Sequence, residues 1–522
     1  MGEQSLLSHK EKSFLAHHPF LKYFAVNAEG AVHIEDFIDD QKTYTIISPN
    51  EISFKKSSLK EVFLHAKNVR IDEAVTWQKV HVYLLDASGY FQIMPKGSLE
   101  TTFIEMPQGL FFNWGRLTSQ THQTLKLEES CFFNQGEMEA LEDTCLSQCS
   151  LFENTGVLKG KGIKVRARVF SNQTRLEGNR VDILASQTFY NRGEIVGRDV
   201  TGVSLGDFLN NGLIQACSTH YLMARHLFFQ GQKSKIEGRS LEMHSFGSFV
   251  TEGEIRGHEV SFTARDFKLG ALARICAAHV TTDAQTASIL GHINAKMLFT
   301  HINERLKVGH SATLQIGHWF LMGKGDFIYQ GSSFNSFKRC SMKNFSGRVK
   351  NDGVWQIQET LEGMCPTLNN DGILEVDAFN LTVGYLKNNK TLKGRGFLWV
   401  ENGENQGIVG GVSGLALSIE GEFKNTGMLY VQNLFGQGCF KNQGMFSGCG
   451  TAEKPIMISL QTFENGEESG RQGRILSDVL KIRAGVTFKF SERSLMVCIS
   501  FFLLSKIYKK SIGIIKCFFY LL

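Results

Sequence analysis

The pattern Phe-x-Asn-x-Gly recurs along the chain at nearly constant intervals. Clear copies begin at Phe152, Phe189 and Phe208, and successive anchor asparagines from Asn113 to Asn210 lie 18 to 21 residues apart. Such a short period over many copies is typical of solenoid proteins, whose repeats bury a common core only when they stack. The 522 residues are therefore expected to form a series of stacked repeats rather than two to four independent globular domains.

The residues after each anchor indicate strands. An aliphatic side chain stands four residues beyond the asparagine, as at Leu158, Leu176 and Ile195, and alternating apolar and polar positions follow. This alternation is typical of β-strands, and only 6 prolines interrupt the amide donors of the chain. We expect an all-β fold, a parallel β-helix (solenoid) with coils of about 19 residues whose equivalent residues stack ~4.8 Å apart.

The anchors are expected to stack as a turn ladder at one corner of the coil. Asparagine tolerates left-handed backbone geometry, and its carboxamide can bond to the asparagine one coil away. The glycine two residues later is expected in a turn conformation that a Cβ disfavours, and the phenylalanine two residues earlier is expected to stack inside the corner. The predicted ladder and turn glycines are Asn113, Asn134, Asn154, Asn172, Asn191, Asn210, Asn370, Asn405, Asn425, Asn442, Gly156, Gly193, Gly212, Gly253, Gly427 and Gly444.

Four segments differ in pattern. Residues 1–30 are expected to be a leader with little structure or a short helix, 31–109 irregular β coils or an N-terminal cap, and 110–493 the parallel β-helix repeats. Between about Phe267 and Arg339 the coils are degenerate. Residues 494–522 form an apolar tail interrupted by lysines, whose longest stretch before Lys506 is shorter than the ~20 residues that a transmembrane helix needs. The tail is interpreted either as a membrane-contacting anchor or as aberrant sequence.

Charge and cysteine content exclude some partners. A net charge of +5 and a charged fraction of 20% do not indicate a nucleic-acid partner. The 11 cysteines show no Cys-x-x-Cys pair, so we interpret them as small buried side chains and predict neither a zinc site nor a disulfide framework. The first residues lack a signal-peptide pattern, which leaves a cytoplasmic location open.

The segments "NTGVLKGKGIKVRA" and "TEGEIRGHEVSFTA" show how the turn, the aliphatic position and the strand follow one another. Over roughly residues 110–470 the chain resembles filamentous haemagglutinin-like exoproteins of the bacterial two-partner secretion class, as a fragment or a diverged relative. The resemblance implies a right-handed β-helical stalk, secreted or at the cell surface and exported through an outer-membrane transporter. It also implies attachment to host-cell or matrix surfaces, glycans included, or display of other domains on a rod.

Parallel β-helices also build polysaccharide lyases and hydrolases, which require carboxylates converging from adjacent coils. Glu194 and Glu254 each follow a turn glycine, but the residues expected beside them are Leu213 and Lys235. The other acidic candidates, Asp199, Asp207 and Asp266, are dispersed. We therefore predict no catalytic residues, cofactor or metal site. A β-helical carbohydrate-active enzyme stays open as an alternative, as does a nonfunctional remnant of a larger exoprotein.

A histidine series is the remaining candidate for metal binding. His292, His301, His310 and His318 are spaced so that alternate members are expected to stack one coil apart on two opposite flanks. Imidazoles ~5 Å apart could share a ligand, so a metal ladder is conceivable, but we interpret the series as exposed polar stacking.

Overall fold

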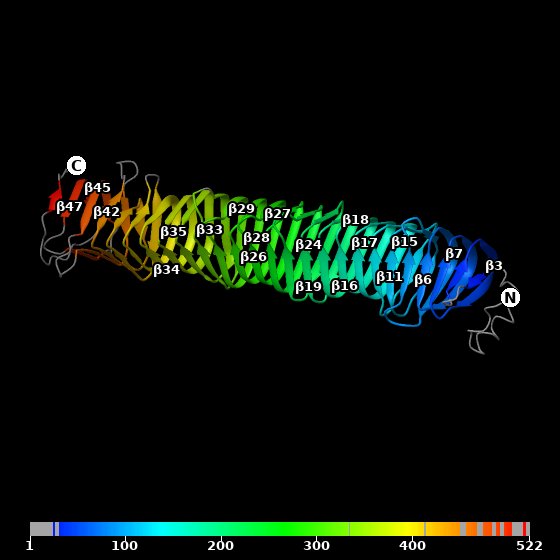
Figure 1. The fold of residues 1–522 in the computed structure, drawn as a ribbon. Coiled ribbons are helices and arrows are strands. Elements are labelled where there is room, and N and C mark those ends of the chain that lie inside the picture. The colour runs from blue at the N-terminus through cyan, green and yellow to red at the C-terminus, as the bar shows by residue number, and fades with distance from the viewer. Residues whose placement is uncertain are drawn as a thin grey trace. The chain divides into compact units, whose positions relative to one another are not determined.

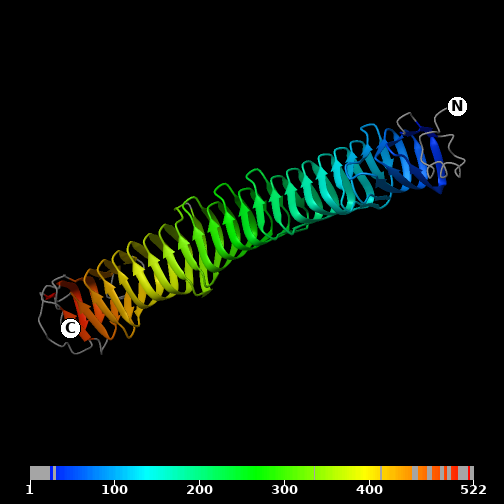
Figure 2. The same cartoon turned by 60° about the horizontal axis from the view of Figure 1, so that its bottom comes forward.

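The protein is a parallel β-solenoid. The computed structural model describes residues 24–26, 31–333, 335–411, 414–448, 456–466, 473–482, 487–490, 495–503 and 515–517. The chain makes about 22 turns of about 19 residues each, with 75% strand and no helix in its described parts. The predicted fold class is confirmed, and right-handed winding stays a prediction. Figures 1 and 2 show the strands of successive coils lying side by side. Two compact units divide the chain, Met1–Val260 and Ser261–Leu522.

In the first unit, one strand of each described coil ends at the same corner, and the end residues pair in parallel from coil to coil. These strands are β2 Val32–Ile34, β4 Glu51–Phe54, β6 Asn68–Ile71, β8 Tyr90–Ile93, β11 Leu110–Asn113, β14 Cys131–Asn134, β15 Glu137–Asn154, β16 Val157–Asn172, β17 Arg175–Asn191, β19 Asp207–Asn210, β22 Leu227–Gln230 and β24 Ser240–Thr251. The other strands of this unit are β1 Phe24–Val26, β3 Phe37–Ile47, β5 Ser57–Ala66, β7 Ala74–Leu84, β9 Ser98–Glu100, β10 Phe103–Glu105, β12 Arg116–Ser119, β13 Gln123–Lys126, β18 Glu194–Ser204, β20 Leu213–Ala216, β21 Thr219–Ala224, β23 Lys235–Glu237 and β25 Glu254–Arg256.

The second unit repeats this arrangement. Strands that end at its corner are β26 Glu259–Leu269, which starts just before the division, β27 Arg274–Ile289, β28 His292–Val308, β30 Asp326–Tyr329, β32 Arg348–Asn351, β33 Val354–Asn370, β34 Ile373–Asn388, β35 Thr391–Asn405, β38 Glu422–Asn425, β41 Cys439–Asn442, β44 Thr462–Asn465 and β46 Thr487–Phe490. Its other strands are β29 Thr313–Gly323, β31 Ser336–Phe345, β36 Ile408–Gly410, β37 Leu415–Ile419, β39 Met428–Tyr430, β40 Asn433–Phe435, β42 Met445–Gly448, β43 Ile456–Ser459, β45 Arg474–Ile482, β47 Leu495–Leu503 and β48 Ile515–Cys517.

A column of phenylalanines fills the core beneath the corner of the first unit. Ring centroids of consecutive members are 4.0 to 5.6 Å apart, and every ring is buried. Its members are Phe91, Phe111, Phe132, Phe152, Phe170, Phe189, Phe208, Phe228 and Phe249. The predicted stacking of phenylalanine inside the corner is thus confirmed, and each ring adds the burial of a large apolar side chain to the core.

Asparagine side chains form the corner ladder of the first unit. From Asn113 to Asn210 each Nδ2 donates to the Oδ1 of the next asparagine at 2.7 to 2.9 Å. The second amide hydrogen goes to a main-chain carbonyl oxygen of that next coil at 3.0 to 3.3 Å, three residues beyond its asparagine. Since these side chains are 0% exposed, the ladder supplies the hydrogen bonds that buried polar groups require, except at its two end atoms, Asn113 Oδ1 and Asn210 Nδ2.

An equivalent ladder runs through the second unit from Asn351 to Asn465, with amide-to-amide distances of 2.6 to 2.8 Å. It includes Asn388, which escapes the sequence pattern because Lys390 stands where the pattern has glycine. Beneath this ladder the phenylalanine position is held by Val349, Leu368, Leu386 and Gly403 before Phe423 restores the aromatic column.

The sequence suggests that asparagine occupies these corners because it tolerates left-handed backbone geometry, and this interpretation is wrong. Among the described residues other than glycine, only Asp36 and Gln148 have a positive φ. The asparagines therefore lie in ordinary extended backbone, and they stabilise the corner through the hydrogen bonds of their carboxamides.

The turn glycines also have no positive φ, which occurs at other glycines such as Gly109 and Gly323. Their position requires glycine because coils approach closely. A Cβ on Gly156 would lie 2.0 Å from the carbonyl oxygen of Gly136. At Gly193, Gly212, Gly253, Gly427 and Gly444 the corresponding gap is 1.9 to 2.5 Å.

Strand pairing extends beyond the segment with clear repeats. β4, β6, β8 and β11 pair in parallel, so the coils of residues 31–109 share the register of those that follow. In the tail, β47 pairs in parallel with β45 and β48 with β47. Residues 1–23 and 27–30 of the leader, and 494, 504–514 and 518–522 of the tail, lie outside the described residues.

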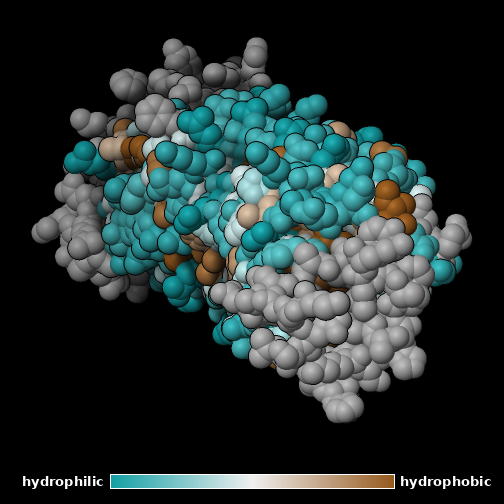
Figure 3. Space-filling model, turned by 45° about the vertical axis from the view of Figure 1, so that its right-hand side comes forward, coloured by the Kyte–Doolittle hydropathy of each residue, from teal (hydrophilic) through white to brown (hydrophobic). Residues whose placement is uncertain are grey.

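The outer surface is mainly polar. On the face seen in Figure 3, hydrophilic residues predominate and hydrophobic ones occur in small groups. In the portion of the chain described here, no helix has the length and apolar character to cross a bilayer.

Candidate functional site

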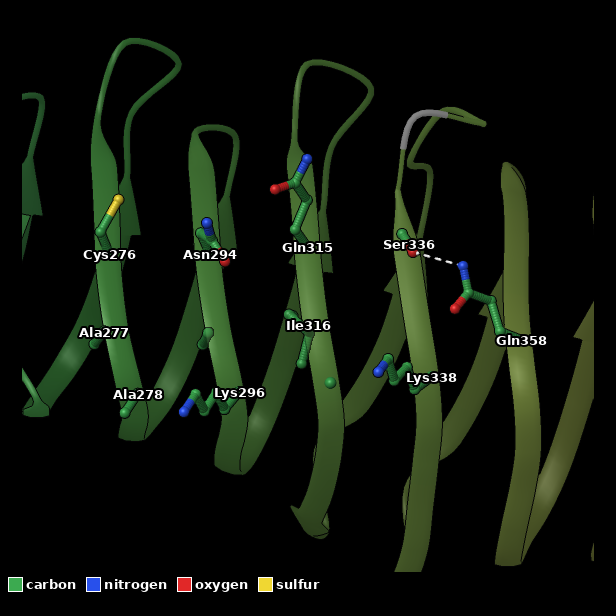
Figure 4. Close-up of a pocket in the computed structure, with 12 residues that line it drawn as sticks. Cys276, Ala277, Ala278, Asn294, Lys296, Gln315, Ile316, Ser336, Lys338 and Gln358 are labelled. Carbon is green, nitrogen blue, oxygen red and sulfur yellow. Dashed lines mark hydrogen bonds between the residues drawn. The ribbon is translucent and has the colours of Figure 1, made fainter.

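An open groove of about 570 Å³ lies on the outside of the second unit. It crosses consecutive strands from β27 through β28, β29 and β31 to β33 (Figure 4). Register places Cys276 beside Asn294, Asn294 beside Gln315, and Gln315 beside Ser336. One row of thiol, amide and hydroxyl groups therefore faces solvent across successive coils, ~4.8 Å apart.

Small residues keep the groove open. Gly317 lies in its floor, where a Cβ would be 2.5 Å from the carbonyl oxygen of Lys296. Ala277 and Ala278 supply the lining from β27, whereas the larger apolar side chain of Ile316 is buried in the core. At the far end Gln358 Nε2 donates to Ser336 Oγ at 3.1 Å, the contact dashed in Figure 4.

Two lysines give the groove its charge. The exposed side chains of Lys296 and Lys338 lie in a second row in Figure 4, below the amides. Within the part of the chain that the structure describes, neither ammonium group forms an ion pair. The neighbouring Glu359 is engaged by Arg339, whose guanidinium holds the pKa of that carboxyl below its usual value, with Lys338 acting in the same direction.

The groove lining contains neither carboxylates nor imidazoles. Of the 12 residues around the groove, none is a carboxylate or an imidazole. The groove can donate and accept hydrogen bonds and attract an anion, but it has no carboxyl pair of the kind that glycoside hydrolysis requires.

The predicted ladder residues lie elsewhere. Asn113, Asn134, Asn154, Asn172 and Asn191 are brought together in one column, as are Asn370, Asn405, Asn425 and Asn442 in the other. All are buried with their carboxamides mutually bonded. They hold coils together and offer no group to a ligand.

The predicted neighbours of the two acidic candidates are confirmed. Leu213 lies beside Glu194, and Lys235 lies between Leu213 and Glu254. Arg175 Nη1 is 3.5 Å from a Glu194 oxygen, so this carboxylate is ion-paired. Asp199 lies beside Arg180, Asp207 beside Thr188, and Asp266 accepts a hydrogen bond from Thr286. The structure brings none of these acidic residues into a shared site.

The predicted stacking of alternate histidines is wrong. His292 lies in register with Thr313 and His301 with Met322. The coil that starts at His292 is longer than the spacing of the histidines, because it includes a turn in which Ala312 N–H donates to the Gly309 carbonyl.

The cysteines are only partly as expected. Of the eight cysteines whose side chains the structure describes, only Cys149, Cys340 and Cys365 are buried. Burial raises the pKa of Cys149 and of Cys365 to about 12, which disfavours thiolate chemistry. Cys217 is exposed, contrary to the expectation that the cysteines are core residues.

One titratable cluster escapes the sequence reasoning. The ring of His81 stacks on Phe63 with centroids 4.3 Å apart. Its Nδ1 bonds to Glu105 at 2.9 Å and its Nε2 to Glu61 at 3.3 Å. Lys126 is 2.8 Å from the other Glu105 oxygen. The cluster thus links four consecutive coils, and both imidazole nitrogens are occupied. The sequence alone does not reveal it, because it depends on which outward side chains of neighbouring coils lie in register.

Comparisons with protein-family models, with curated proteins and with solved structures gave no match.

Proposed function

We propose that this chain is a non-enzymatic β-helical stalk of a bacterial surface or secreted exoprotein. It attaches through its outer surface to host cells or extracellular matrix, or displays other domains. The filamentous haemagglutinin-like assignment, export through an outer-membrane transporter and a location outside the cell belong to this proposal, and the repeat pattern supports them. Buried ladders hold its coils together, so only the side chains that face outward are available to contact a partner.

The observation that carries the proposal is the lining of the groove. It combines a row of amide and hydroxyl groups with two unpaired lysines and has no carboxylate or imidazole. These groups suit reversible binding of a polar, anionic surface, because hydrogen bonds give specificity and positive charge speeds the encounter.

Adhesion of protein-coated beads to cultured epithelial cells and to immobilised matrix proteins tests this function. Beads with the wild-type chain should adhere above beads with albumin, and Lys296→Gln combined with Lys338→Gln should reduce adhesion several-fold. The matched control is Lys159→Gln with Lys161→Gln, two exposed lysines of the first unit. Adhesion no greater than that of albumin contradicts the proposal.

The enzymatic alternative needs its own assay. Incubation of the full chain with pooled polysaccharides should release neither reducing nor unsaturated ends. Turnover above that of a heat-denatured control would contradict the stalk proposal and support a carbohydrate-active enzyme.

A further inference from the structure

A group of aromatic side chains lies on the outside of the second unit, on other strand segments than the groove. On β35, Phe397 is 38% and Trp399 is 43% exposed, whereas Leu398 between them is fully buried. The alternation of the strand thus directs two large rings to solvent, where most of the exterior is polar. Exposed apolar groups of this kind mark interaction surfaces when they gather rather than occur singly.

A third ring joins them from two coils further on. Phe435 of β40 lies 5.4 Å from Phe397, centroid to centroid, with 52° between the ring planes. In the coil between them, the register positions beside Phe397 and Trp399 hold Ala416 and Ser418. Because these two residues are small, the rings meet across that coil and keep part of their faces uncovered. We call Phe397, Trp399 and Phe435 the aromatic platform.

Neutral polar groups border the platform. Asn380 and Thr382 of β34 lie in register with Phe397 and Trp399, and both side chains are exposed. Neither side chain forms a hydrogen bond with another of the described residues, so their amide and hydroxyl groups are available to a ligand. On the other side Asn433 of β40 lies beside Ala416.

The charged groups nearby leave an excess of carboxylate. Arg395 Nη2 is 2.8 Å from Asp377, and Lys343 Nζ is 3.3 Å from Glu362. Glu420 Oε1 lies 3.5 Å from Ser418 Oγ, and neither Glu420 nor Glu401 forms an ion pair with another described residue. The platform therefore does not favour an acidic partner, and an uncharged ligand with an apolar face and a hydroxyl-bearing rim suits it, because carboxylate oxygens accept hydrogen bonds from hydroxyls. A pyranose ring has this combination: its C–H face packs on an aromatic ring, and its hydroxyls bond to amides and hydroxyls.

The exposed area argues against a second copy of the chain as the occupant. An aromatic side chain has on the order of 150–250 Å² to bury, so at 38% and 43% exposure Phe397 and Trp399 offer about 120–200 Å² together. A stable dimer buries ~800 Å² on each partner. The surface is adequate for one or two sugar rings.

We propose that the aromatic platform binds a neutral polysaccharide by stacking pyranose rings on Trp399 and Phe397, with Asn380 and Thr382 bonding to the sugar hydroxyls. The proposal rests on the attachment function for its purpose, since it names a class of glycan that the stalk would hold. The proposed binding does not involve Lys296 or Lys338 of the groove.

Affinity electrophoresis of the full chain through gels that contain hydroxyethyl cellulose, xylan or galactomannan tests this binding. The wild type should be retarded by at least one of these polymers. Trp399→Thr should weaken the retardation roughly tenfold, as expected for loss of one stacked ring, and Trp399→Phe should retain most of it. Phe246→Thr is the matched control, because Phe246 is 72% exposed in the first unit.

Acrylamide quenching gives an independent readout. Trp77, Trp319 and Trp355 are fully buried and Trp114 is half-buried, so quenching of the wild type reports on Trp114 and Trp399, and its difference from Trp399→Phe isolates Trp399. The retarding polymer should protect the wild type from acrylamide, and this protection should vanish in Trp399→Phe, which keeps the ring but loses the reporter.

Absence of retardation by all three polymers overturns the proposal, as does equal retardation of Trp399→Thr. Concentration-dependent sedimentation that Trp399→Thr abolishes overturns it too, by making a second copy the occupant. Retardation without adhesion to cells or matrix would contradict the attachment function alone, and adhesion without retardation would contradict the platform alone.

Discussion

Two stretches of each unit build the corner of the coil differently. One carries the asparagine ladder, and the other carries apolar side chains, Ile34, Phe54, Ile71 and Ile93 in the first unit and Leu269, Ile289, Val308 and Tyr329 in the second. In the first unit Gln230 and Thr251, which are bonded to each other, follow the ladder. The backbone does not change with them. Trp114 N–H donates to the Ile93 carbonyl at 2.9 Å, just as Gln135 N–H donates to the Asn113 carbonyl at 2.8 Å.

This comparison shows that the ladder is not needed to close a coil. An asparagine at the corner depends on its neighbours, because each carboxamide needs a donor on one side and an acceptor on the other. The two end atoms of the first ladder, Asn113 Oδ1 beside Ile93 and Asn210 Nδ2 beside Gln230, have no hydrogen-bond partner among the described residues.

A break in the middle of a ladder should have the largest effect. Asn172→Leu removes the acceptor of Asn154 and the donor to Asn191, both fully buried. We expect a loss of about 3–5 kcal/mol in the free energy of unfolding, because two buried amides lose partners at once. Urea unfolding followed by circular dichroism measures it. The apolar control Ile93→Leu should cost less than ~1.5 kcal/mol; equal losses would refute the distinction.

His220 extends the comparison to an isolated polar group. It lies between Val200 and Leu241 in the core, with Nε2 bonded to the Glu237 carbonyl and Nδ1 without a partner. Burial lowers its pKa to about 4.

Because the folded pKa lies below the ordinary value of about 6.5, the unfolded chain takes up the proton first, and stability should fall as the pH drops from about 6.5 to about 4. The total is about 3 kcal/mol. Urea unfolding across this pH range measures it, and His220→Leu should remove most of this slope; an unchanged slope would assign it to other groups.

A new asparagine should cost less at the edge of a ladder than away from it. In Ile93→Asn the added amide lies beside Asn113 and can donate to its unpaired Oδ1. In Ile71→Asn the neighbours are Phe54 and Ile93, which offer no partner. We expect Ile71→Asn to be the less stable variant by about 2 kcal/mol, from the unpaired buried amide. Thermal unfolding of both variants ranks them, and the reverse order would count against the ladder account.

The smallest expected effect concerns the column beneath the ladder. The second unit uses Leu368 and Leu386 where the first uses phenylalanine, so leucine is compatible with the position. Phe189→Leu should cost about 1–2 kcal/mol, because the stacked ring 4.0 Å from Phe208 is lost and the smaller side chain fills less space. Denaturant unfolding against Phe246→Leu, at a site 72% exposed, provides the baseline. A loss in the free energy of unfolding greater than that of Asn172→Leu would contradict the expectation that the ladder contributes more than the phenylalanine column.

The sequence predicts the fold where the corner carries a recognisable residue. Asn154, Asn172 and Asn191 repeat at a near-constant period, and this period with the alternation after it defines a parallel solenoid. Where the corner holds Ile289 or Val308, the corner residue cannot be told from any other strand residue in the sequence. Coils that are regular in the structure therefore appear degenerate in the sequence.

The groove and the platform are harder to predict because they depend on which outward residues meet across coils of unequal length. Cys276 to Asn294 spans fewer residues than Asn294 to Gln315. A fixed period therefore misplaces side chains such as His292, and only the actual register brings Trp399 and Phe435 onto one face.

The carboxamides of the first ladder all point the same way, so their dipoles add, as peptide dipoles do in a helix. The column carries a partial negative pole at Asn113 Oδ1 and a partial positive pole at Asn210 Nδ2. It is thus directional: grafted coils would have to present a donor to the first pole and an acceptor to the second, and a segment inserted in the opposite sense would oppose like poles inside the core.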